Sequence, residues 1–277
     1  MKVGIAVLVT MLLLSGCEAS KDVGVYSYLP LSRLESPEPD PKLFSAGPGA
    51  GGMARLELTN DQRVHSPTDA PPDAQLRAML IPKVSVTPLP VVSGSLKGYN
   101  GVFFAPQVKV MPLAALAPDS PLSLAVTMAY GKFHEQYDYD STSNNDPDAH
   151  TTMHEWLRDT AVIAGWRTSR AVMVYGGVFR TSVNYKGTYR SNTVPARTYE
   201  QESVASGANL GLAWNVASWA RVLAEVSAAH VRTGDDTEEV LTPGISGEFF
   251  FGSWPWRRRP SRPEEPVEVV PVEEPPR

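Results

Sequence analysis

The 277-residue sequence contains one cysteine, Cys17, so no disulfide can form within the chain. A single thiol also excludes zinc and iron–sulfur sites that are built from several cysteines. Positive charge is scarce too, because 25 Lys and Arg stand against 30 Asp and Glu, which gives a formal net charge of -5. Nucleic-acid binding depends on cations that neutralise phosphates. We therefore expect no nucleic-acid partner.

Long hydrophobic runs are missing from the chain after its N-terminal segment. Polar residues interrupt every apolar stretch in this later part of the sequence. A membrane-spanning helix needs about 20 consecutive apolar residues, so none is predicted there. Apolar residues at helical spacing are scarce as well. The pattern that recurs is alternation of apolar and polar residues with a period of two, which is typical of β-strands.

The N-terminus has the features of a secretory signal, because a basic start at Lys2 precedes an apolar run over residues 3–14. The residues Leu14-Ser15-Gly16-Cys17 at its end resemble the lipobox of bacterial lipoproteins. This resemblance implies that residues 1–16 form a signal peptide and that Cys17 is acylated as the first mature residue. The alternative is an ordinary signal in which the cysteine occurs by chance.

Acylation of Cys17 would hold the protein on a membrane, since each buried CH₂ group of a lipid chain contributes about 0.8 kcal/mol. In enterobacterial lipoproteins, an aspartate after the cysteine favours retention in the inner membrane. By that resemblance, Glu18 permits transfer to the outer membrane. Membrane lipid is therefore the first partner that we expect.

Two proline-rich segments flank the body of the chain. Residues 17–43 contain Ser36-Pro37-Glu38-Pro39-Asp40-Pro41, which forms neither helix nor sheet, and we expect a linker outside the folded domain. Residues 255–277 repeat Pro, Glu and Val and predict an extended, disordered tail. The tail is a candidate tether to an envelope protein or to the cell wall, with an inert end as the alternative.

Between these segments, several stretches place apolar residues on one strand face and polar or small residues on the other. Strands are predicted within residues 102–110, 120–133, 171–186, 199–214, 220–228 and 245–251, and 153–167 alternates less regularly. In 171–186, Met173, Tyr175 and Phe179 share one face and Arg180 lies on the opposite one. The earlier stretches near 54–58 and 83–87 are weaker, and prolines interrupt the second of them.

Short and long connections alternate along the second half of the chain. Residues 168–170 and 215–218 predict tight turns, whereas 134–152, 187–198 and 233–241 predict long polar loops. This alternation, with aromatic residues at the strand ends, resembles that of outer-membrane β-barrels. The resemblance covers residues 44–254 and implies an all-β, antiparallel up-and-down barrel of about ten strands, with eight to twelve allowed. An even strand number places the N- and C-termini in the periplasm.

A soluble β-sandwich gives the same alternation and is the alternative fold. The apolar strand faces would then form a dry core instead of facing lipid. In that case the chain would be a periplasmic lipoprotein that binds a ligand or a partner.

In the barrel, the polar strand faces point into the lumen. The candidate lumen residues carry charges of both signs and are Arg55, Glu57, Lys83, Lys109, Arg180, Arg221, Glu225 and Glu248. Opposite charges in a narrow lumen are expected to pair, because unpaired buried charge is costly. We therefore expect a filled barrel, with a narrow solute channel as the alternative.

No pattern of catalytic or metal-binding residues stands out in the sequence. A Gly-x-Ser-x-Gly elbow is absent, and no recognised zinc motif contains the histidines, which are His65, His134, His150, His154 and His230. We expect no cofactor, no metal and no enzymatic activity, with a barrel hydrolase as the alternative. The expected function is a structural or interaction role in the cell envelope, through the outer loops and the C-terminal tail.

Overall fold

The computed structural model describes residues 26–57, 75–99, 103–139, 149–190, 197–233 and 236–253. The strands are β1 (Tyr26–Pro30), β2 (Phe44–Gly47), β3 (Gly49–Glu57), β4 (Gln75–Leu80), β5 (Lys83–Leu89), β6 (Val92–Tyr99), β7 (Phe103–Val110), β8 (Leu122–Tyr139), β9 (Ala149–Arg167), β10 (Val172–Arg190), β11 (Arg197–Ala217), β12 (Ala220–Thr233) and β13 (Asp236–Phe251). Helix α2 (Pro112–Leu116) connects β7 to β8. Within the described residues, no helix is long and apolar enough to cross a membrane.

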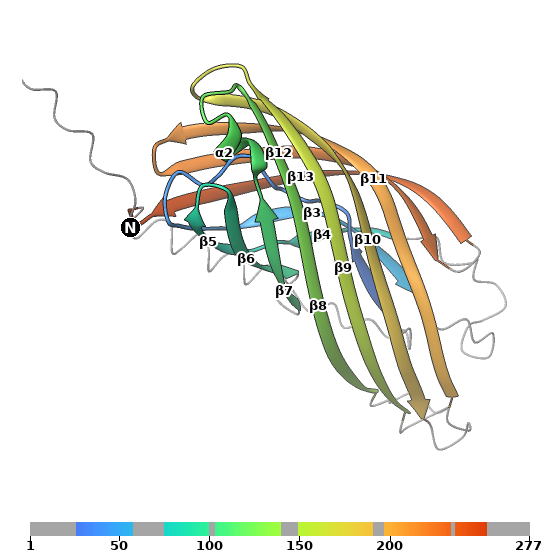
Figure 1. Cartoon of the computed structure of the whole chain (residues 1–277). Helices are drawn as coiled ribbons and strands as arrows, with labels where there is room; N and C mark the ends of the chain where they lie inside the picture. Colours follow the sequence, from blue (N-terminus) through green and yellow to red (C-terminus); the bar gives the residue numbers. More distant parts are fainter. Residues whose placement is uncertain are drawn as a thin grey trace, which may run out of the picture.

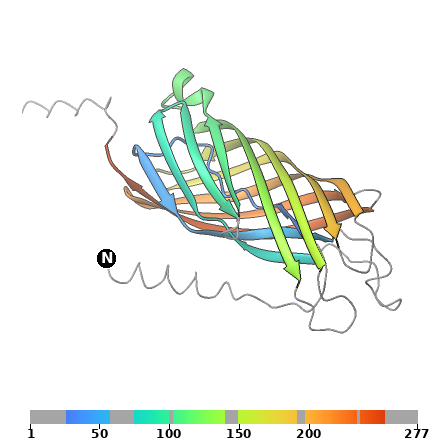
Figure 2. The ribbon, with the colours of Figure 1, turned by 90° about the horizontal axis from the view of Figure 1, so that it is seen from below.

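The antiparallel sheet closes on itself. From β5 to β13, each strand pairs with the next one along the chain, and β13 then pairs with both β2 and β3. β2 and β3 follow one another and occupy one position of the ring, as do β4 and β5, because β2 pairs with β5 and β3 pairs with β4. The ring therefore has ten positions, which confirms the predicted all-β antiparallel barrel. Figure 2 shows the strands wound obliquely around it.

The two faces of the strands follow the predicted alternation in most of the ring. Large apolar side chains face outward and are exposed, among them Phe104, Val126, Met128, Val162, Leu210, Val226 and Ile245. Their neighbours along the chain point inward and are buried, among them Gln107, Thr127, Asp159, Asn209, Ser227 and Glu248. Neighbouring side chains of a strand point to opposite faces. The outward apolar residues of β7, β8, β9, β11, β12 and β13 therefore place the polar residues between them inside the barrel.

Strand β10 is the exception to the predicted orientation. Met173, Tyr175 and Phe179 share one face as expected, but that face is buried inside the barrel. Arg180, which was expected in the lumen, is exposed on the outer face. The outward positions nearer the turn to β9 are taken by other apolar residues, Val174 and Val178. Both faces of β10 are therefore apolar along part of its length, so alternation alone could not orient the strand.

The barrel wall is uneven in height. β8, β9, β10 and β11 contain 18, 19, 19 and 21 residues, whereas β5, β6 and β7 contain 7, 8 and 8. Figure 1 shows the long strands extending past the short ones at one end. Much of the expected loops 134–152, 187–198 and 233–241 is strand, since β8 continues to Tyr139 and β13 begins at Asp236. Their polarity indicated loops, but ladder hydrogen bonds extend the strands beyond the apolar part of the wall.

The two ends of the barrel differ, and the chain enters it from one of them. We call the end where β8 stops at Tyr139 the loop end, and the end where β9 stops at Arg167 the turn end. β1 pairs antiparallel with β3, which places Tyr26 opposite Glu57 at the loop end. Phe44 pairs with Phe251 at the turn end. The described chain therefore begins at the loop end and finishes at the turn end. The expected periplasmic placement of the N- and C-termini concerns residues outside the described ranges.

Candidate functional site: the filled lumen

The lumen is filled by residues 31–40, which we call the inner segment. All ten are buried except Pro39, which is partly exposed. This segment was expected to be a linker outside the barrel, so the structure corrects that expectation. An eight-stranded barrel has room only for its own side chains, whereas the ten-position ring of this chain also admits one irregular segment of backbone.

Small residues of the wall leave space for the inner segment. The amides of Leu31 and Ser32 both donate to the carbonyl oxygen of Gly52, at 3.0 and 3.3 Å. The Ser32 hydroxyl oxygen in turn accepts from the Gly52 amide at 2.9 Å. A Cβ atom added to Gly51 would lie 2.4 Å from the Cβ of Ser32. Glycine on β3 is therefore required for this close approach.

The upper part of the inner segment is held by Arg33 and Glu225. The Arg33 guanidinium lies 3.3 Å from the Asp159 carboxylate, donates to the Thr181 hydroxyl and covers the Phe179 ring at 4.2 Å from its centroid. The Glu225 carboxylate accepts from the backbone amides of Arg33 and Leu34 at 2.8 and 3.1 Å. Strands β9, β10 and β12 thus bind one short stretch of backbone and its cation.

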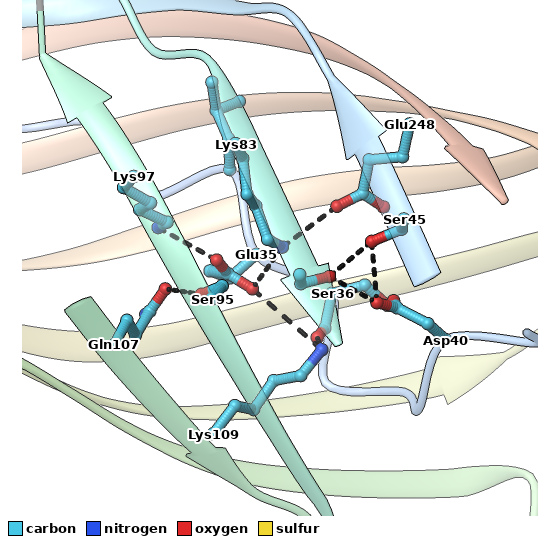
Figure 3. A network of polar contacts seen from close by, with 12 residues as sticks. Glu35, Ser36, Asp40, Ser45, Lys83, Ser95, Lys97, Gln107, Lys109 and Glu248 are labelled. Carbon is cyan, nitrogen blue, oxygen red and sulfur yellow. Dashed lines mark hydrogen bonds and ion pairs between the residues drawn. The ribbon is translucent and has the colours of Figure 1, made fainter. Parts of the chain in front are cut away.

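Glu35 lies among three lysines from three consecutive strands. Its carboxylate oxygens are 3.0 Å from Nζ of Lys83, 2.9 Å from Nζ of Lys97 and 4.0 Å from Nζ of Lys109. Figure 3 shows these ammonium groups converging on the carboxylate from β5, β6 and β7. Burial raises the pKa of Glu35, but the three lysines outweigh it and lower the pKa from 4.5 to about 2. Glu35 is therefore a carboxylate at neutral pH.

Asp40 anchors the lower end of the inner segment, next to the turn end. It accepts from the hydroxyls of Ser45 and Ser85, both at 2.8 Å, and from Nη2 of Arg221 at 3.0 Å. Figure 3 shows the contact between Asp40 and Ser45. Burial opposes ionisation of Asp40, but Lys109 and Arg221 lower its pKa below the ordinary value. Arg221 also donates from Nε to Glu248 at 2.7 Å. This network joins the inner segment to β2, β5 and β12.

The wall lysines also bind the backbone carbonyls of the inner segment. Lys97 donates to the carbonyl oxygen of Arg33 at 2.8 Å, and Lys109 donates to that of Glu38 at 3.1 Å. Buried carbonyls without donors are costly, and the inner segment forms no ladder with the wall over these residues. Its shape is therefore fixed by side chains of the wall, which makes the filling specific to this segment.

The predicted lumen residues fall into three groups in the structure. Lys83, Lys109, Arg221, Glu225 and Glu248 lie in the lumen and belong to the networks described above. Arg180 lies on the outer face of β10.

The remaining predicted residues lie beyond what the structure describes. Arg55 and Glu57 are in β3, but their side chains are outside the described part of the chain, and so is Cys17. The predicted tail 255–277 also lies outside the described residues.

Sequence reasoning missed several residues of the lumen. Lys97 follows the alternation of β6, where Ser93 and Lys97 are buried, and a closer reading of residues 91–98 could have found it. Arg33, Glu35 and Asp40 lie in an irregular, proline-rich stretch with no period that points to a buried position.

The candidate histidines and metal ligands are placed only in part by the described residues. No group of three or more His, Cys, Asp or Glu side chains is arranged to hold a metal ion among them. His230 is exposed on the outer face of β12, opposite Glu239 of β13. His134 pairs with His154 across β8 and β9.

Comparison with known proteins assigns the chain to no family. No protein-family model and no curated protein matches the chain. The attachment invasion locus protein Ail of Yersinia pestis is 11% identical with a TM-score of 0.34, over 75% of this chain and 98% of that one. The outer membrane protease OmpT of Escherichia coli is 8% identical with a TM-score of 0.39, over 86% and 100%. The N-terminal β-barrel domain of Pseudomonas aeruginosa OprF is 11% identical with a TM-score of 0.29, over 75% and 98%.

Proposed function

We propose that the chain is an outer-membrane β-barrel whose own inner segment closes the lumen, and that it has a structural or interaction role in the cell envelope. The observation that carries the proposal is the seating of residues 31–40, in which Arg33, Glu35 and Asp40 each form an ion pair with the wall. A solute that crosses the barrel would have to displace all three pairs. The proposal assigns no reaction to the barrel.

The membrane placement is supported by the outer face of the wall. Exposed apolar side chains cover the outer face of β5, β7, β8, β10 and β13, including Val84, Phe104, Met128, Val178 and Leu241. Exposure of so large an apolar surface to water is unfavourable in a soluble protein. An outer-membrane barrel, in contrast, presents an apolar band about 25 Å tall to lipid. The lipobox-like residues before Cys17 support acylation as a second attachment.

Loops and tail are the proposed contact regions for envelope partners. The long strands β8–β11 extend beyond the apolar band at the loop end, and residues 140–148 and 191–196 connect them in the sequence. The tail after Ser253 follows β13 in the sequence, and its proposed partner is an envelope protein or the cell wall.

Conductance in planar bilayers tests the closed lumen. We expect the unaltered protein to be silent, whereas R33Q/E35Q/D40N should open, because it removes the charges that seat the inner segment. The matched control is K186Q/E200Q, which removes an exposed ion pair of the outer face and should stay silent. A steady current through the unaltered protein would refute the closed lumen and would support the alternative of a narrow solute channel.

Membrane extraction separates the barrel from the soluble alternative. We expect the unboiled protein to migrate faster on a gel than the boiled protein. The C17S variant should no longer incorporate labelled palmitate, yet it should remain in the membrane fraction. Release of C17S into the soluble fraction without detergent would instead support a periplasmic lipoprotein.

A further inference from the structure

The outer face of the barrel has a sharp boundary between apolar and polar positions. The ladders place Val126, Val162, Val178, Ala208, Ala228 and Leu241 in one row across β8–β13, and every member is apolar. The next outward row toward the loop end contains Met128, Thr160, Arg180, Ser206, His230 and Glu239. On β9–β13 the lipid-facing band therefore ends between the two rows, whereas on β8 it continues through the exposed side chains of Met128 and Tyr130 and ends before Lys132.

Three cations lie beside this boundary on neighbouring strands. Lys132 of β8, Arg158 of β9 and Arg180 of β10 are all exposed on the outer face. We call these residues the outer cationic patch. Lys132 is opposite Trp156, so Arg158 is one diagonal step away, and Arg180 is opposite Thr160, one diagonal step from Arg158. Diagonal neighbours on antiparallel strands are about 7–8 Å apart.

The described ladder partners of the patch are uncharged. Arg158 is opposite Tyr130 and Ser182, and Arg180 is opposite Thr160 and Ser206. The Lys132 ammonium lies 5.9 Å from the centroid of the Trp156 ring.

A nearby cation outside the patch shows the contrast. Lys186, farther toward the loop end, pairs with Glu200 at 3.3 Å. The patch contains three like charges at close range, which repel one another unless an anion from outside binds them.

We propose that the outer cationic patch binds the phosphate groups of membrane lipid headgroups at the loop-side face of the bilayer. The patch lies where the apolar band ends, which is the level of the headgroups. Its two guanidinium groups can bind phosphate oxygens in pairs, and Trp156 is of the residue type that favours membrane interfaces. The inference rests on the membrane placement proposed above and adds the class of lipid and its site.

Binding of lipid to the full chain in neutral detergent tests the site. Folded protein is mixed with phosphatidylglycerol or phosphatidylcholine, and the bound lipid is counted by native mass spectrometry. We expect preference for phosphatidylglycerol, falling as salt rises. Each cation near an anionic lipid surface contributes about 1 kcal/mol, so K132Q/R158Q/R180Q should weaken phosphatidylglycerol binding on the order of 100-fold. R170Q, an exposed cation at the turn end, is the matched control and should leave the preference unchanged.

Each contrary outcome has a distinct meaning. If the triple variant keeps its preference, or R170Q loses as much, the patch does not bind lipid phosphate. Full displacement of phosphatidylglycerol by an equal concentration of inorganic phosphate would identify a soluble anion as ligand and overturn the lipid assignment. The faster unboiled gel band is measured in the same samples, and its absence from the unaltered protein would refute the membrane barrel itself. If the triple variant alone fails to fold, R180Q replaces it, with about a fivefold loss expected.

Discussion

Neutralising Glu35 should destabilise the barrel more than any exposed charge change. E35Q keeps the size of the side chain but leaves Lys83, Lys97 and Lys109 without their shared carboxylate in a buried site. Breaking a buried ion pair by removing one partner costs about 3–5 kcal/mol. A pKa lowered from 4.5 to about 2 gives a matching value of about 3 kcal/mol at neutral pH.

Urea unfolding of the protein in lipid vesicles, followed by tryptophan fluorescence, measures this free energy. E200Q is the control, since Glu200 belongs to an exposed pair that contributes at most about 1 kcal/mol. The double variant E35Q/K97Q should recover part of the loss, because one uncompensated ammonium is removed with the carboxylate. If E35Q lies within about 1 kcal/mol of the unaltered protein, the inner segment is not seated as described.

The same carboxylate should give the barrel a dependence on acid pH. The folded-state pKa of Glu35 is lower than its unfolded value, so its contribution is complete above pH 4.5 and is lost as the pH falls toward about 2. The unaltered protein should therefore lose stability across this window, and E35Q should lose less. Equal slopes for the two proteins would show that Glu35 does not carry the effect.

Three further perturbations test the seating and the direction of the chain. Replacing Gly51 with Leu should displace Ser32, make the barrel conduct in planar bilayers and lower the free energy of unfolding by about 1–3 kcal/mol. The control is G247A, whose added Cβ has no atom within 4 Å and which should show no conductance. R33M should cost about 3–5 kcal/mol in urea unfolding, because Asp159 loses its cation in a buried site, and R33M/D159N should recover part of it. An epitope inserted before Tyr26 and one inserted within 140–148 should be accessible to antibody on the same side of the membrane. An epitope inserted after Ser253 should be accessible on the opposite side. Labelling of the epitopes before Tyr26 and after Ser253 on one side would contradict the register of β1.

The ring of strands could be predicted because lipid and lumen impose opposite polarities on neighbouring positions. Where one face is clearly apolar, as in Val126 and Met128 of β8, period-two alternation gives both the strand and its orientation. In β10 this criterion fails, since Phe179 packs under the Arg33 guanidinium inside the barrel while Val178 faces outward. The orientation of β10 depends on a contact with a segment more than a hundred residues away in the chain, which no local pattern contains.

The inner segment was missed because polarity and proline were taken as signs of exposure. That rule holds when the interior of a protein is apolar, but the interior of this barrel is lined by Lys97, Lys109 and Arg221. A segment that fills such a lumen must itself be charged. It must also satisfy its backbone without a ladder, and Pro37 and Pro39 help because each removes one amide donor. A proline-rich, acidic stretch before the first strand of the ring is therefore equally suited to be a linker or a plug. The pairing of β1 with β3 decides between them, because it starts the stretch at the loop end and obliges residues 31–40 to pass through the lumen before Phe44.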